Sequence, residues 1–74
     1  MTEHTLDARG FICPLPVLKA RKKLLSIPAG DTLRVLVTDA NAPHDFELFC
    51  RENSYILRAV NKNADVAEVV VEKA

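Results

Sequence analysis

The segment Cys13-Pro14-Leu15-Pro16 places one nucleophilic side chain at the point where a short strand pattern gives way to a helical pattern. A residue that precedes proline is sterically pushed out of the helical conformation, so we expect Cys13 to cap the helix. Pro14 would then take the first helical position and Pro16 a place in the first turn, where no intrahelical hydrogen bond is lost. The motif therefore predicts a thiol fixed at the start of a helix.

A helix N-terminus favours the ionised form of a thiol. Unpaired backbone N–H groups and the helix macrodipole stabilise negative charge there, which lowers the thiol pKa and increases the nucleophilic thiolate. Arg9, Lys19 and Lys22 lie near Cys13 in the sequence, and they either support the thiolate and meet an acidic partner surface or form an ordinary solvated face. The pattern indicates an exposed thiol that a second protein reaches, whereas an arbitrary free cysteine would be a small buried residue.

The second cysteine has a different setting. Cys50 shares a helical face with Phe46 and Phe49, which predicts a core residue, with a resolving thiol as the alternative. His4 and His44 form no close chelating pair with each other or with either cysteine. We therefore expect no metal site, and nothing in the sequence indicates a cofactor.

Three acids lie near the predicted ends of strands and helices. Asp7 is expected to turn toward the loop of Cys13 and hold its backbone, rather than to act chemically. Asp39 and Asp45 flank the start of the second predicted helix, where capping is favoured over partner binding. Arg21 falls within the apolar arc of the first helix, so it either extends over the sheet edge or pairs with an acid such as Asp45.

Apolar periodicity predicts six elements in the order strand, helix, strand, helix, strand, strand. The predicted strands cover residues 4–9, 33–38, 54–60 and 66–71, the helices cover residues 14–27 and 43–53, and a polar turn covers residues 61–65. This order predicts an α/β two-layer sandwich, in which a mixed four-stranded sheet carries both helices on one face. Residues 1–74 are expected to form a single domain.

Composition narrows the class of function. Ten basic and ten acidic residues give a formal net charge of zero, which removes the bulk attraction that nucleic acids and anionic membranes exert on basic proteins. Three Phe and one Tyr are too few to stack bases and fill a core as well. The N-terminal residues contain no apolar run and the cysteines form no dense framework, so we expect a reduced, cytoplasmic protein that contacts neither membrane nor nucleic acid directly.

Three segments carry a family resemblance. They are the Leu-Asp-Ala-Arg-Gly lead-in at residues 6–10, the Cys-Pro-Leu-Pro-Val segment at residues 13–17, and the Asp-Phe and Phe-Cys pairs within residues 45–50. Together they closely resemble the TusA/SirA family of sulfur carriers, and the resemblance covers essentially the whole chain. The fold of that family has the same element order. Family members often have Asp-Pro where this chain has Asp39-Ala40, and several tRNA-thiolation carriers have Met where this chain has Leu18, so the pathway stays open.

The resemblance implies a role for Cys13 as the carrier of a persulfide. A cysteine desulfurase or rhodanese would donate sulfane sulfur, and an acceptor protein serving tRNA thiolation, molybdenum-cofactor assembly or sulfur oxidation would receive it. Such a carrier acts only with its partner enzymes, and we expect it to be a monomer. Pro14 and Pro16 would shape the turn that presents the thiol, and Arg9 and Lys22 would help binding.

Two other classes of function are also considered. A regulatory interaction module would bind a protein through the same exposed end without moving sulfur, and its binding would survive replacement of Cys13 by Ser. A thiol–disulfide oxidoreductase is disfavoured because no second cysteine stands near Cys13 in the sequence. A disulfide between Cys13 and Cys50 on mild oxidation would revive it.

Overall fold

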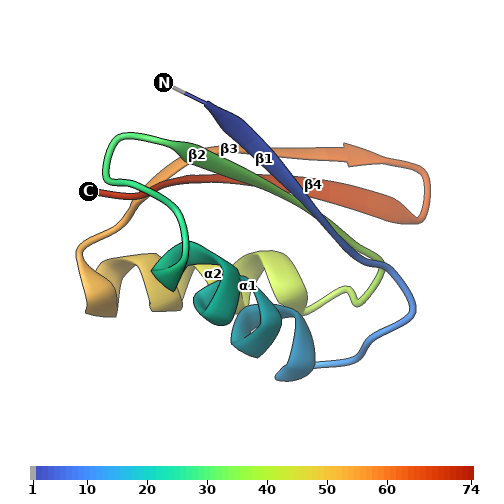
Figure 1. Cartoon of the computed structure of the whole chain (residues 1–74). Helices are drawn as coiled ribbons and strands as arrows, with labels where there is room; N and C mark the ends of the chain where they lie inside the picture. The colour runs from blue at the N-terminus through green and yellow to red at the C-terminus, as the bar shows by residue number, and fades with distance from the viewer. Residues whose placement is uncertain (1) are drawn as a thin grey trace.

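Six elements follow one another along the chain in the predicted order (Figure 1). They are β1 (Glu3–Ala8), α1 (Leu15–Leu25), β2 (Thr32–Val37), α2 (Ala42–Asn53), β3 (Ile56–Asn63) and β4 (Val66–Glu72). The structure is a computed structural model that describes residues 2–74, so Met1 of the predicted domain 1–74 lies outside the described residues. No helix within residues 2–74 has the length and apolar character needed to cross a bilayer.

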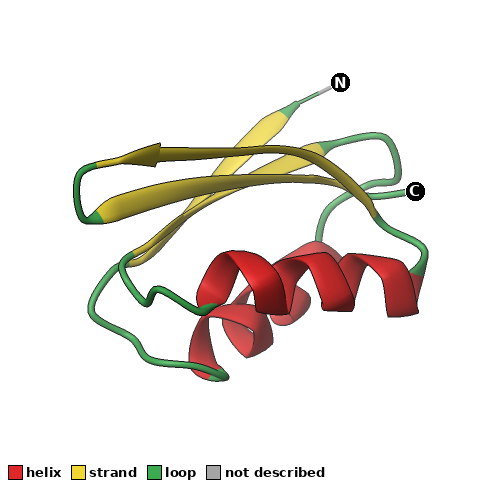
Figure 2. Cartoon of the chain, turned by 180° about the vertical axis from the view of Figure 1, so that it is seen from behind, coloured by secondary structure: helices red, strands yellow, loops and turns green. Residues whose placement is uncertain are grey.

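The four strands form one mixed sheet in the order β1-β2-β4-β3. β1 and β2 are parallel and are connected through α1, while β4 runs antiparallel to both β2 and β3. Both helices lie against the same face of the sheet, so the molecule has two layers (Figure 2). The predicted α/β two-layer sandwich is confirmed.

The core lies between the helices and the inner face of the sheet. Alternate residues of the two central strands, β2 and β4, are buried, as the period-two pattern of a sheet with one covered face requires. Helical spacing aligns Ala20 and Leu24 of α1, and Phe46, Phe49 and Cys50 of α2, on the covered side. The prediction that Cys50 is a core residue is confirmed.

The start of α1 differs from the prediction. The helix begins at Leu15 and Pro14 is its N-cap, so Cys13 precedes the cap and Pro16 is the proline in the first turn. The cause is a tight turn before the helix, in which the N–H of Leu15 donates to the carbonyl of Ile12 at 2.9 Å. The Cys13–Pro14 peptide bond inside this turn is cis.

The closing hairpin is longer than predicted. Asn61, Lys62 and Asn63 belong to β3, where they pair with the first residues of β4, although their polar side chains indicated a turn. The turn itself is Ala64-Asp65, with Ala64 at a φ of 56°. Two-residue hairpin turns match strand twist best when a central residue has positive φ, which lets the strands pair right up to the turn.

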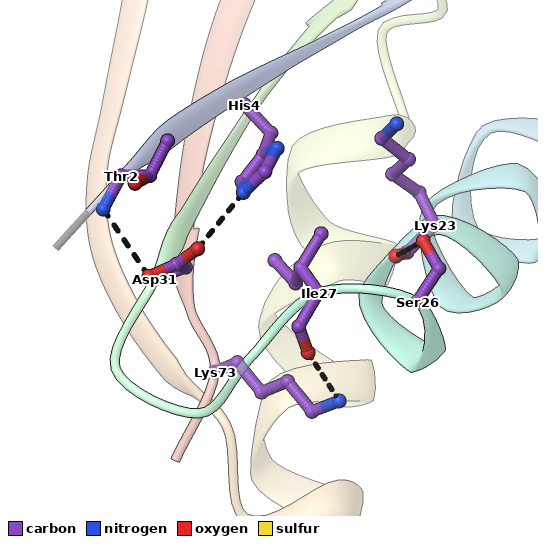
Figure 3. Close-up of polar contacts among 7 residues, drawn as sticks. All are labelled: Thr2, His4, Lys23, Ser26, Ile27, Asp31 and Lys73. Carbon is purple, nitrogen blue, oxygen red and sulfur yellow. Dashed lines mark hydrogen bonds and ion pairs between the residues drawn. The ribbon is translucent and has the colours of Figure 1, made fainter.

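A polar junction ties the N-terminal end of β1 to the start of β2. The carboxylate of Asp31 accepts hydrogen bonds from the backbone N–H of Thr2 at 3.2 Å and from the His4 ring Nε2 at 2.9 Å, and Figure 3 shows both bonds as dashed lines. Nearby, Lys73 donates from Nζ to the carbonyl of Ile27 at 2.8 Å. Asp31 is the buried acid of the fold, and its bonds fix the end of the sheet opposite the Cys13 loop.

Candidate functional site

The parallel pairing of β1 and β2 brings two loops together. Ala8 and Val37 are register partners at the last position of each strand, so the residues that follow them emerge at the same edge of the sheet. The N–H of Gly10 donates to the Thr38 hydroxyl at 2.9 Å, which joins the two loops directly. Gly10 has a φ of 84°, a conformation that glycine adopts without strain, and it turns the chain toward Cys13.

Two acids hold Cys13. Its backbone N–H donates to Oδ2 of Asp39 at 2.6 Å, and its thiol donates to Oδ2 of Asp45 in the first turn of α2. The other oxygen of Asp39 accepts the N–H of Asn41 at 2.9 Å, which fixes that carboxylate between the two loops. The side chain of Cys13 is exposed, as predicted, and it faces the start of α2 rather than the N–H groups of α1.

The electrostatic prediction for the thiol was wrong. The hydrogen bond to Asp45 raises the pKa of the Cys13 thiol above its ordinary value, with smaller contributions from partial burial and from the charges of Asp45 and Asp39. Adjacent negative charge disfavours the thiolate, and the helix begins two residues further on, at Leu15. In the free protein the sulfur is therefore held as a protonated donor.

The basic residues near Cys13 in sequence do not reverse this effect. Arg9 pairs with Asp7 at 2.9 Å, and Lys19 lies over the ring of Phe11 at 4.5 Å from its centroid. Lys22 lies in a shallow groove between α1 and Leu6. The charged groups that shift the pKa of Cys13 are both acids, so the predicted support of the thiolate by Arg9, Lys19 and Lys22 is not present in this structure.

Asp7 binds the backbone of the loop as predicted, whereas Asp39 and Asp45 have different partners from those predicted. Asp7 binds the backbone N–H of Arg9 at 3.1 Å, at the start of the loop, while Asp39 is the acid that holds Cys13 itself. Neither Asp39 nor Asp45 makes the side-chain cap of α2, whose N-cap is Asn41. Arg21 is exposed, and the carboxylate of Asp45 that it was a candidate to pair with binds the Cys13 thiol.

The two prolines of the motif have separate positions. Pro14 is exposed at the N-cap, whereas Pro16 is fully buried and anchors the first turn of α1 in the core. Four exposed large apolar side chains lie on either side of Cys13 in the sequence, and we call them the apolar collar. Its members are Phe11, Ile12, Leu15 and Leu18. Large apolar side chains left exposed to water in this way are a candidate docking surface for another protein.

The contacts of Asp39 and Asp45 with Cys13 were missed from the sequence. The available signal was positional, since Asp39 follows the second of two strands joined through a helix, as Cys13 follows the first. Such strands are usually parallel neighbours, so their C-terminal loops meet at one edge of the sheet.

Comparison with known proteins agrees with this geometry. The family profile described as sulfurtransferase TusA matches residues 4–73, which include the Cys13 loop and all six elements except Glu3 at the start of β1. The chain belongs to the TusA family. The family predicted from the three sequence segments is confirmed.

Individual TusA-family relatives cover nearly the whole chain. A protein of Neisseria meningitidis serogroup A, named as a candidate sulfur carrier, is 44% identical over 72 residues, which are 97% of each chain. The sulfur carrier protein TusA of Allochromatium vinosum is 31% identical over 72 residues, covering 97% of this chain and 95% of the relative. The crystal structure of a SirA-like protein from Desulfitobacterium hafniense superposes with a TM-score of 0.82 at 30% identity, covering 97% of this chain and 96% of the other.

Proposed function

We propose that Cys13 accepts sulfane sulfur as a persulfide from a cysteine desulfurase or a rhodanese and relays it to an acceptor protein. The observation that supports this is an exposed thiol, presented by the Cys-Pro-x-Pro turn of a sulfur-carrier family. A carrier must offer its sulfur to the active sites of two other proteins in turn, and an exposed turn suits this better than an enclosed cavity.

The apolar collar supports the protein-docking part of the proposal. Ile12 is 71% exposed and Leu18 is 52% exposed, and both flank the turn that carries Cys13. Covering these side chains with a partner would remove apolar area from water at the point where the two sulfur atoms must meet. Lys22 is proposed to contact an acidic partner surface beside the collar. Arg9 and Pro14 are proposed to present the loop to the partner, and the buried Pro16 to fix it to the core.

The acceptor is proposed to belong to tRNA thiolation, molybdenum-cofactor assembly or sulfur oxidation. The carrier would work in the reducing cytoplasm, as a monomer, and only together with its donor and acceptor enzymes. Both of its cysteines are free, and Cys13 and Cys50 differ in setting, since Cys13 is exposed while Cys50 is buried in the core.

A regulatory interaction module is the second candidate, and the apolar collar favours it equally. The collar would bind a partner whether or not sulfur moved. Replacement of Cys13 by Ser separates the two functions, because a pure interaction module would keep both its binding and its biological effect.

Intact-protein mass spectrometry tests the carrier proposal. Wild type, Cys13→Ser and Cys50→Ala are each incubated with a cysteine desulfurase plus cysteine, and separately with a rhodanese plus thiosulfate. We expect a gain of one sulfur atom that reductant reverses in wild type and Cys50→Ala, and no gain in Cys13→Ser. Failure of wild type to gain sulfur from either donor, when alkylation shows that Cys13 is accessible, would favour the interaction module.

A further inference from the structure

The thiol of Cys13 has a hydrogen-bond acceptor in a fixed position. Asp45 lies in the first turn of α2, where its own N–H donates to the carbonyl of Asn41 at 3.1 Å. The next residue, Phe46, is fully buried and anchors this turn in the core. The carboxylate is therefore held by the helix, and its Oδ2 accepts the thiol hydrogen.

We propose that Asp45 is a catalytic residue of sulfur transfer, which takes the proton from the Cys13 thiol at Oδ2 as the sulfur attacks. The proposal rests on the proposed function of Cys13 as a persulfide carrier. It assigns chemistry to a carboxylate that sequence reasoning treated as a helix cap. A general base must lie within hydrogen-bond reach of the proton it removes, and Asp45 already makes that hydrogen bond in the free protein.

The transfer step balances without an external oxidant. The Cys13 proton moves to Oδ2 of Asp45 while Sγ attacks the terminal sulfur of the donor persulfide. A new S–S bond forms at Cys13, the S–S bond of the donor breaks, and its electron pair leaves on the donor cysteine sulfur. That thiolate recovers a proton from the Asp45 carboxyl group, so one thiol and one persulfide become one persulfide and one thiol.

The charges around the thiol explain why a base is useful here. Asp45 from α2 and Asp39 from the loop after β2 are the charged groups that act on the sulfur, and both oppose free thiolate. Two basic side chains that lie near Cys13 in the sequence are engaged elsewhere, Arg9 with Asp7 and Lys19 with Phe11. Proton removal at the moment of attack avoids any need to populate a thiolate beside two carboxylates.

Sulfur uptake from glutathione persulfide tests the proposal, because a small donor avoids effects on docking. Rates are measured against pH for the Cys50→Ala protein and for the same protein carrying Asp45→Asn, Asp45→Glu or Glu47→Gln. Glu47 is an exposed acid of the same helix that pairs with Arg51, so it controls for the loss of one negative charge from α2. The thiolate fraction of each variant is followed by its ultraviolet absorbance, and circular dichroism checks the fold.

We expect Asp45→Asn to have more thiolate at neutral pH and yet to take up sulfur at least about tenfold more slowly. A positioned base typically contributes about a hundredfold or more, and the larger thiolate population offsets part of its loss. The rates of the parent and Asp45→Asn should converge at a pH above the thiol pKa, where no base is needed. Asp45→Glu should recover part of the rate, and Glu47→Gln should match the parent.

One outcome would contradict the role of Asp45, and a different outcome would contradict the carrier function of Cys13. If Asp45→Asn takes up sulfur faster, in proportion to its thiolate fraction, Asp45 only suppresses ionisation and the inference is wrong, although the carrier function stands. If the parent gains no sulfur from glutathione persulfide or from the enzyme donors, the proposed function itself fails.

Discussion

The backbone N–H of Cys13 and the carboxylate of Asp39, 26 residues apart in the chain, are joined by a hydrogen bond of 2.6 Å. This bond connects the loop after β1 to the loop after β2, and the same carboxylate also accepts the N–H of Asn41. Hydrogen bonds from backbone N–H groups to an ionised carboxylate are among the stronger ones in proteins. The position of the thiol therefore depends on β2 as much as on the helix that follows it.

Replacement of Asp39 by Asn should loosen the Cys13 turn without unfolding the protein. An amide has one carbonyl oxygen, so the N–H groups of Cys13 and Asn41 would compete for it. We expect amide hydrogen exchange at Cys13 to become several-fold faster, as measured by NMR. Thr38→Val is the matched control, because it removes the neighbouring bond to Gly10 and should affect Gly10 instead. If amide hydrogen exchange at Cys13 were unchanged in Asp39→Asn, the conformation of the turn would not depend on the hydrogen bond to Asp39.

Replacement of Ile12 by Asp should weaken binding to the sulfur donor. Ile12 is the most exposed member of the apolar collar, and a charge there would have to be desolvated on docking. We expect the Kd to rise at least about tenfold, or ~1.4 kcal/mol, by titration calorimetry. Leu25→Asp is the control, since Leu25 is 66% exposed in the last turn of α1, away from Cys13. Equal effects of the two variants would argue against docking through the collar.

The Asp31 junction should make stability depend on pH in the acidic range. Hydrogen bonds from His4 and from the Thr2 backbone hold the pKa of Asp31 below its ordinary value of 3.8. A lowered pKa in the folded state means that the contribution is fully present above pH ~4 and is lost as the pH falls through the folded pKa. We expect Asp31→Asn to lower the urea midpoint near neutral pH, and the difference from wild type to shrink below pH ~3.

Glu52→Gln, at an exposed acid of α2, is the control for that measurement and should leave the midpoint unchanged. A difference between wild type and Asp31→Asn that stayed constant with pH would mean that Asp31 contributes by packing alone.

Replacement of Phe46 by Ala should leave the protein largely unfolded. Phe46 is fully buried between α2 and the sheet, and such truncations cost about 3–5 kcal/mol. Domains have a total stability of roughly 0.05 to 0.15 kcal/mol per residue, so the loss is comparable to the whole free energy of unfolding. Thermal unfolding followed by circular dichroism measures the effect. Leu25→Ala, at an exposed position, should change stability by less than about 0.5 kcal/mol.

The sequence predicted the layers of the fold better than the environment of the thiol. Element order and the covered faces follow from local spacing, which is why the helical face with Phe46 and Cys50 was placed in the core correctly. The charge at Cys13 depends on Asp39 and Asp45, which approach it only through the parallel pairing of β1 with β2 and the packing of α2. Local helix-start reasoning therefore gave the wrong direction for the thiol pKa, because the deciding groups are distant in sequence.

The hairpin error has a similar cause. Asn61, Lys62 and Asn63 read as a turn because their side chains are polar, yet their backbone groups pair with β4. Side chains on an exposed edge strand need not be apolar, since that strand buries little surface. The positive φ of Ala64, which places the turn, is not signalled by its residue type.

The strand order β1-β2-β4-β3 also makes the whole sheet depend on the last strand of the chain. β4 enters the sheet between two strands that precede it in the chain, so β3 has no strand partner and β2 lacks its antiparallel neighbour until β4 arrives. A chain that has formed only residues 2–63 would expose one side of its central strand and an unpaired hairpin arm. Because long-range pairing must close the sheet before it becomes stable, the domain should gain its order in one late, cooperative step rather than strand by strand.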